Sequence, residues 1–273
     1  MPTTQLRGLL RRSRNSTILL ALIVLAGVAL RVREAMDPLW FDEVWVASSL
    51  YSGSLRDALY YARVPQSTPP LWIALNYYFV QAFAPGYFLL RLFPLLSGIA
   101  LIIASAGYAG RVLGSSYRLA GGAVAAASGF LIAYSGQLKQ YESDALFATL
   151  LLWGLVACLQ RRGAGRWFVM AALYGVSIFL AYTQLLLMPL VVLALAWEAW
   201  RKRLGVALAA GLSAGVAAAG IAALLIFIRP NTSPMLKAFW TDQFPQSWAG
   251  AAPFYWLKAQ QWTRVLYRKS AAR

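Results

Sequence analysis

Residues 69–84 read PPLWIALNYYFVQAFA, and hydropathy alone makes them a membrane span. The segment is shorter than the ~20 residues that cross the ~30 Å hydrocarbon core of a bilayer. It is rich in Tyr and Trp and carries Asn76 and Gln81, a composition typical of a helix that lies in the membrane interface. Whether this segment crosses the membrane decides on which side every later connection lies.

Seven further apolar runs lie on either side of this segment. They are 16–30, 88–110, 119–135, 145–160, 167–183, 184–200 and 204–228. Most reach or approach the length of a spanning helix. The first follows a basic N-terminus, as in a signal peptide, but residues 31–33 read RVR where a cleavage site needs small residues. The sequence predicts an all-α polytopic membrane protein of about seven transmembrane helices, with an interfacial helix in the first outer loop, residues 34–87.

Basic residues separate a seven-span topology from an eight-span one. If residues 69–84 spanned the membrane, the basic clusters at 111–118, 161–166 and 201–203 would lie opposite the N-terminal arginines, against the positive-inside rule. Without that span, all these clusters lie on the cytoplasmic side, with the N-terminus inside and the C-terminus outside. The net charge of +16 is thus a topology signal, and we expect no nucleic-acid partner.

Composition restricts both the class of protein and its chemistry. Hydrophobic residues make up 60% of the 273 positions, more than a soluble domain of this size can bury, and charged residues only 12%. The chain has no His and one Cys, Cys158, which excludes a Ser-His triad, a His or Cys metal centre and an internal disulfide. In the seven-span topology all carboxylates except Glu198 fall on the outer side, which points to an extracytoplasmic acidic site.

The first acidic motif, LWFDEVW at residues 39–45, directly follows the first run. Asp42 and Glu43 are adjacent, and neighbours on a helix point ~100° apart, so we expect the two carboxylates to perform different tasks. One acts as a base, while the other orients it or pairs with an arginine. The alternative is that both are solvated in a loop beside a belt of aromatic residues.

The second motif, YSGQLKQYESD at residues 134–144, follows the third run. Glu142 and Asp144, two positions apart, are expected to face the same way in an extended segment. Lys139 either meets a phosphate as a point charge or snorkels to lipid headgroups. The two motifs share one side of the membrane only in the seven-span topology.

These residue types suit a transfer reaction at a sugar centre. A carboxylate can act as general base toward an acceptor hydroxyl or amine. A phosphate leaving group needs cationic stabilisation, from Lys139 or an outer arginine, and a single displacement with one base inverts the sugar centre. The outer arginines are Arg31, Arg33, Arg56, Arg63 and Arg91.

Four motifs, in this order, resemble the membrane glycosyltransferases of the GT-C superfamily. They are the Asp42–Glu43 pair, PPL at 69–71, RLFPLLSG at 91–98 and KQYxSD at 139–144. The similarity covers roughly residues 16–228 and is closest to the branch of protein O-mannosyltransferases and lipid A aminoarabinose transferases. It implies a polyprenyl-phosphate-linked sugar donor, a lipid, glycan or protein acceptor, inversion at the anomeric carbon, and a site on the extracytoplasmic side of the plasma (inner) membrane.

The resemblance also implies roles for single residues. Asp42 is the acceptor-activating carboxylate, with Glu43 and Asp144 as further catalytic acids. The implied substrate-binding residues are Lys139, Gln140, Tyr141, Glu142, Arg91 and Pro70. Some relatives hold a divalent metal between comparable acids and others need none, so a Mg²⁺ or Mn²⁺ ion stays an open alternative.

Three units are expected: a cytoplasmic N-terminus at 1–15, the membrane module at 16–228 and an outer segment at 229–273. Family members usually continue with further spans, so we expect a minimal core, a truncated module or half of a split enzyme. A transporter or flippase is one alternative function, although the span centres carry almost none of the charge it needs. A non-catalytic membrane scaffold is the other.

Overall fold

The computed structural model describes residues 3–61, 68–161, 163–232, 234 and 238. Within these residues every regular element is a helix, which confirms the predicted all-α class. The elements are α1 (Thr3–Ala35), α2 (Phe41–Leu50), α3 (Leu55–Leu59), α4 (Pro70–Phe83), α5 (Tyr87–Leu90), α6 (Leu92–Val112), η1 (Ser115–Tyr117), α7 (Arg118–Ala127), α8 (Gly129–Ser135), α9 (Tyr141–Gln160), α10 (Ala164–Ser177), α11 (Gln184–Trp200), α12 (Val206–Ala222), η2 (Ala223–Ile228) and α13 (Arg229–Asn231).

Four helices of the described chain are long and apolar enough to cross a membrane, which indicates a membrane protein. These stretches are Ser16–Ala35, Leu92–Val112, Tyr141–Gln160 and Val206–Asn231. The expectation of about seven full-length spans is therefore met only in part. The run 119–135 is divided into α7 and α8 at Ser128, whose backbone is extended (φ −65°, ψ 115°). The runs 167–183 and 184–200 form the shorter helices α10 and α11, of 14 and 17 residues.

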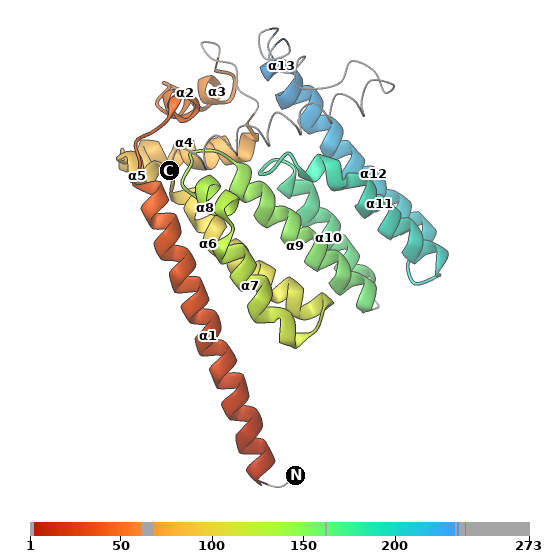
Figure 1. Cartoon of the computed structure of the whole chain (residues 1–273). Coiled ribbons are helices and arrows are strands. Elements are labelled where there is room, and N and C mark those ends of the chain that lie inside the picture. Colours follow the sequence, from red (N-terminus) through yellow and green to blue (C-terminus); the bar gives the residue numbers. More distant parts are fainter. Residues whose placement is uncertain (1–2, 62–67, 162, 233, 235–237, 239–273) are drawn as a thin grey trace, which may run out of the picture.

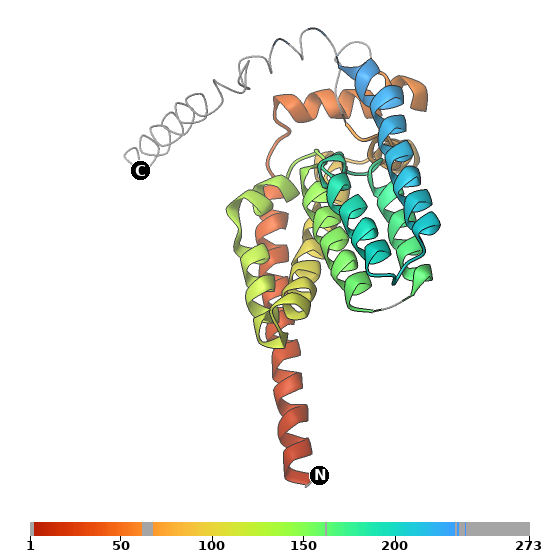
Figure 2. The same cartoon turned by 90° about the vertical axis from the view of Figure 1, so that its right-hand side faces the viewer.

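The long helices form a bundle that short helices cap at one end. The basic clusters lie in three connections, α6–α7, α9–α10 and α11–α12. These connections lie at the same end of the bundle as the N-terminus of α1 (Figures 1 and 2). Helices α2 to α5 lie at the opposite end, and α4 lies across the bundle instead of along it (Figure 1). We call the end formed by α2 to α5 the capped end.

A cluster of buried apolar side chains holds the capped end together. Val46 and Leu50 of α2 pack with Trp72, Ile73 and other residues of α4. Leu138, from the connection between α8 and α9, belongs to the same cluster and is fully buried. The cluster therefore packs the second acidic motif against α2, which carries the first. Two further clusters lie in the bundle, one between α9, α10, α11 and α12 and one around α6 and α7.

Residues 34–87, expected as an outer loop with one interfacial helix, contain three helices longer than a single turn, α2, α3 and α4. The first acidic motif is therefore helical, and Asp42 and Glu43 lie in the first turn of α2. At the other end of the chain, the helix that begins at Val206 continues without a break to Asn231. Most of the expected outer segment 229–273 lies outside the described residues.

Candidate functional site

Glu43 is a fully buried carboxylate whose two oxygens both accept hydrogen bonds. Oε1 and Oε2 accept from Nε and Nη2 of Arg91 at 2.8 and 2.7 Å. The backbone N–H of Leu138 also donates to Oε1, and that of Trp40 to Oε2 at 3.2 Å. The bond to Trp40 closes the first turn of α2, as the glutamate of a capping box does. Glu43 thus connects α2, the start of α6 and the connection between α8 and α9.

Arg91 directly precedes α6 and uses all five of its N–H groups. Besides its two bonds to Glu43, it donates to the carbonyl oxygens of Ala35 at 2.8 Å, Pro38 at 3.0 Å and Asp37. Its side chain is buried, where an arginine is stable only when it is paired and hydrogen-bonded. Arg91 therefore holds the link between α1 and α2, and it has no N–H left for a substrate.

Asp42 points away from its neighbour Glu43 and stays partly open to solvent. Its Oδ2 lies 3.6 Å from Nζ of Lys139, and the two side chains are 35% and 12% exposed. Glu43 also fixes the backbone next to Lys139, through its bond to Leu138. Glu43 thus holds in place the partner of the half-buried Asp42, and the two carboxylates point in different directions on the helix.

Lys139 is a partly desolvated cation. Burial lowers its pKa from the ordinary value of 10.5, and the charges of Asp42 and Glu43 raise the pKa in part. An ammonium group that has lost water and has one partner at 3.6 Å is stabilised by a further anionic ligand.

Tyr141, a residue of the second acidic motif, begins α9. Its ring lies 5.1 Å from that of Tyr134. Oδ1 of Asp144 accepts hydrogen bonds from the N–H and the hydroxyl of Thr183, at 3.4 and 3.2 Å. Asp42, Tyr141 and Asp144 therefore gather at the capped end, together with Lys139.

Glu142 and Asp144 do not face the same way, so the expectation of an extended segment is wrong. Both lie in the first turn of α9, where positions two apart point ~200° apart around the helix. Asp144 faces Thr183, whereas Glu142 faces α1, with Oε1 3.8 Å from Nη2 of Arg31. A helix satisfies the backbone inside an apolar bundle, which an extended segment does not.

Arg31 and Glu142 are both fully buried among the helices of the bundle. Arg31 donates to Oγ of Ser135 at 3.0 Å. It also donates to the carbonyl oxygens of Gly27, Ala125 and Ala126 at 3.3, 2.8 and 3.2 Å. Gly98 packs directly against this group, since a Cβ there would lie 2.2 Å from Oγ of Ser135 and 2.9 Å from Oε1 of Glu142. We call these residues the Arg31 cluster, and their contacts join α1, α6, α7, α8 and α9.

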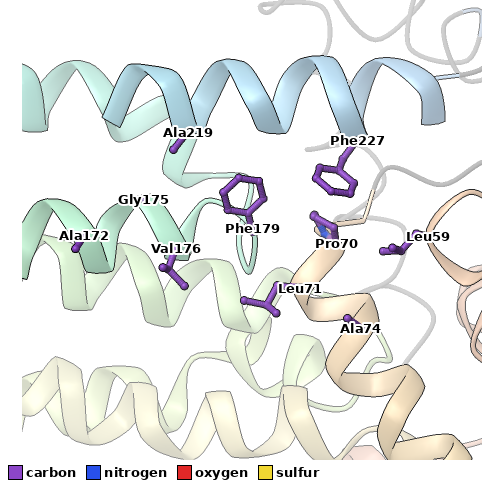
Figure 3. Close-up of a pocket in the computed structure, with 10 residues that line it drawn as sticks. All are labelled: Leu59, Pro70, Leu71, Ala74, Ala172, Gly175, Val176, Phe179, Ala219 and Phe227. Carbon is purple, nitrogen blue, oxygen red and sulfur yellow. The ribbon is translucent and has the colours of Figure 1, made fainter. Parts of the chain in front are cut away.

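An apolar groove of about 570 Å³ opens between α4, α10 and the continuous helix α12–η2 (Figure 3). Pro70, predicted to bind substrate, lines it with Leu71, Phe179 and Phe227. The backbone N–H of Leu71 donates to the carbonyl oxygen of Phe179 at 2.9 Å, which ties α4 to the end of α10. Thr183, the partner of Asp144, follows Phe179 by four positions. A short stretch of chain therefore connects the lining of the groove to the partner of Asp144.

Several buried polar atoms near Asp144 have no hydrogen-bond partner among the described residues. They are Oε1 of Gln140, the hydroxyl of Tyr182 and both amide atoms of Gln184. The carbonyl of Gln140 accepts from the N–H of Asp144 at 2.9 Å, and Tyr182 and Gln184 flank Thr183. In the sequence, residues 182–184 carry one weak signal, a polar Thr-Gln pair at the junction of two apolar runs.

The residues at the capped end do not fit a resident divalent metal. Within the described ranges, no three His, Cys, Asp or Glu side chains are grouped so as to hold an ion. Mg²⁺ is commonly bound by one or two carboxylates and substrate phosphates, but Asp42 already has an ammonium group beside it.

Of the remaining outer arginines, Arg33 and Arg56 are exposed, and Arg63 lies outside the described residues.

No protein-family model matches this chain, and no curated protein matches its sequence. The functional assignment therefore depends on the site residues themselves and on the motifs that carry the resemblance to GT-C glycosyltransferases.

Proposed function

We propose that this chain is a membrane glycosyltransferase, or the membrane module of one, that transfers a sugar from a polyprenyl-phosphate donor to an acceptor at the capped end. One observation carries the proposal: Asp42 and Lys139, from two motifs far apart in the sequence, lie 3.6 Å apart and partly open to solvent. A carboxylate base beside an ammonium group supplies the two charges that displacement at a sugar phosphate needs.

In the proposed reaction, Asp42 removes the proton of an acceptor hydroxyl or amine. The acceptor atom forms a bond to the anomeric carbon, and the bond between that carbon and the phosphate oxygen breaks. The polyprenyl phosphate leaves with the electron pair and is stabilised by Lys139. The sugar centre inverts because attack and departure take place on opposite faces.

The other site residues divide into two groups. Glu43 and Arg91 are positioning residues, since their polar atoms are already hydrogen-bonded to the protein. Asp144, Tyr141 and Gln140 extend the polar surface from Asp42, and we assign them to the sugar. The unpartnered Oε1 of Gln140 supports this assignment, because a buried polar atom without a partner is costly unless a ligand hydroxyl bonds to it.

The apolar groove supports a lipid-linked donor. Its lining residues are apolar, and one of them, Phe179, stands four positions before Thr183, which donates to Asp144. Burying an isoprenoid tail there contributes about 25 cal/mol per Å² of apolar surface. We assign Pro70 and Phe179 to this tail.

The proposal includes a topology of seven spans. Helices α10 and α11 and the α7–α8 pair are short spans, which a bilayer accommodates by local thinning. Helix α4 is the interfacial helix, and the capped end lies on the extracytoplasmic face of the plasma membrane. The common position of the basic connections and the start of α1 supports this orientation (Figure 1).

The proposal is tested with the full chain in lipid nanodiscs, supplied with labelled polyprenyl-phosphate sugars and lipid, glycan or peptide acceptors. Asp42→Asn is expected to slow transfer by ~10²–10⁴-fold, the usual contribution of a general base. Asp57→Asn is the matched control on α3, where the carboxylate bonds to Ser54, and it should keep the wild-type rate. Equal rates for Asp42→Asn and wild type would contradict the assignment of the base. Absence of transfer by the wild type from every donor would contradict the function.

A further inference from the structure

We infer that the Lys139–Asp42 pair imposes an order of binding, in which the donor phosphate draws Lys139 away from Asp42 before Asp42 can act as a base. This inference rests on the proposed function, because it requires an anionic phosphate ligand at the capped end. In addition, when no donor is bound, the proposed base Asp42 is held in an ion pair with Lys139. An acceptor that arrives first therefore meets a carboxylate that is already neutralised.

Lys139 is the cation at this site that is able to change partners. Arg91 uses every N–H on Glu43 and three carbonyl groups, and Arg31 is buried among carbonyl oxygens. Lys139 instead has a single acidic partner, 3.6 Å away, and keeps 12% of its side chain exposed. A compact ammonium on a flexible four-carbon stem can turn toward a new anion without movement of the backbone.

The surrounding backbone confines this movement to the side chain. Leu138 is fully buried, and its N–H donates to Glu43. The N–H of Lys139 donates to the carbonyl of Gln137 at 2.7 Å. The position of the Lys139 Cα is thus set by contacts that a ligand at Asp42 does not touch, and only the stem and the ammonium remain free to turn.

Charge favours the exchange once a phosphate arrives. A phosphate offers more negative charge and more acceptor oxygens than one carboxylate, so it competes well for the ammonium. Departure of Lys139 leaves the Asp42 carboxylate free to accept a hydrogen bond from the acceptor, beside a Glu43 whose charge Arg91 neutralises.

The test measures binding of polyprenyl phosphate to the full chain in neutral-lipid nanodiscs, in a double-mutant cycle of Asp42→Asn and Lys139→Gln. Asp42 raises the pKa of Lys139, so a mildly acidic buffer keeps the lysine protonated in every variant. Asp42→Asn should tighten binding by about two- to fivefold, the size expected for release of one ion pair. Asp42→Asn should have no such effect when Lys139 is already Gln. Asp57→Asn, with the same change of charge, should leave the affinity unchanged.

The outcomes separate this inference from the function on which it rests. An equal gain from Asp42→Asn in both backgrounds means direct repulsion between Asp42 and the phosphate, and it overturns the exchange of partners while the function stands. No gain in either background also overturns the exchange. Failure of the wild type to bind polyprenyl phosphate overturns the proposed function as well. Lys139→Met provides a second neutral background, and the unfolding midpoint of each variant shows that it is folded.

Discussion

The guanidinium of Arg91 and the carboxylate of Glu43 form a two-point ion pair, with N–O distances of 2.8 and 2.7 Å. Arg91 stands at the start of α6, and Glu43 lies in the first turn of α2. Through Leu138, Glu43 also holds the connection that carries Lys139. One buried pair therefore joins three segments that are distant in the sequence and places Lys139 beside Asp42.

Removing the charge of Glu43 should destabilise the whole capped end. Glu43→Gln leaves the Arg91 guanidinium buried without its counter-charge, and breaking a buried pair in this way costs about 3–5 kcal/mol of unfolding free energy. The change is measured as a lower unfolding midpoint in detergent, followed by tryptophan fluorescence. Asp37→Asn is the control, because Asp37 is exposed and gives Arg91 only its backbone carbonyl. Equal midpoints for the two variants would show that the pair does not stabilise the fold.

Gly98 should not tolerate even one methyl group. In Gly98→Ala the new Cβ would meet Oγ of Ser135 at 2.2 Å and Nε of Arg31 at 2.8 Å, so the Arg31 cluster must move. We expect a loss of about 1–3 kcal/mol in the free energy of unfolding, typical of overpacking in a core. Gly211→Ala on α12 is the matched control, since a Cβ there meets nothing within 4 Å. It should be neutral or up to ~1 kcal/mol more stable, because alanine favours helix. Similar losses in both variants would contradict close packing at Gly98.

Binding of polyprenyl phosphate should weaken in alkaline solution as Lys139 loses its proton. Only the ammonium form attracts the phosphate, and burial lowers the pKa of Lys139 below its ordinary 10.5, so affinity falls before an exposed lysine would titrate. Lys139→Arg should move this alkaline limit upward, since a guanidinium stays protonated. The measurement is the dissociation constant as a function of pH for the two proteins. Coincident limits would show that another group controls the binding.

The two ends of the bundle should face opposite sides of the membrane. In a Cys158→Ala background, the variant Asp57→Cys should react with an impermeant thiol reagent added outside intact cells. The variant Ser115→Cys, in the connection after α6, should react only after permeabilisation, because the basic connections are expected on the cytoplasmic side. Both positions are exposed, so both should react in permeabilised cells. Labelling of position 115 from outside would contradict the seven-span topology.

Part of the site follows from local rules alone. The different directions of Asp42 and Glu43 are predictable, because adjacent residues on a helix point ~100° apart. The choice of Arg91 as the partner of Glu43 is not predictable, since the sequence does not show which outer arginine lies beside α2. The second motif differs from the expected extended segment for a local reason, because acidic residues such as Glu142 and Asp144 are favoured in the first turn of a helix.

Hydropathy has a related limit in the bundle. It sums apolar character over a window and does not register a backbone break, so the run 119–135 looked continuous across Ser128. The contact of Thr183 with Asp144 joins two separate helices, and nothing in either run points to the other.

Composition and the spacing of charges were enough to predict the all-α class, the apolar runs and a common end of the bundle for the basic clusters, because each of these features is a property of contiguous residues. Which charged groups are buried in contacts between helices depends on the packing of segments that are distant in the sequence. Arg31, Arg91, Glu43 and Glu142 are buried at helix contacts, whereas Asp42 and Lys139 are not. A charged side chain is neutralised when a partner of opposite charge lies within a few ångströms and water is excluded. Both conditions depend on segments that are far apart in the sequence.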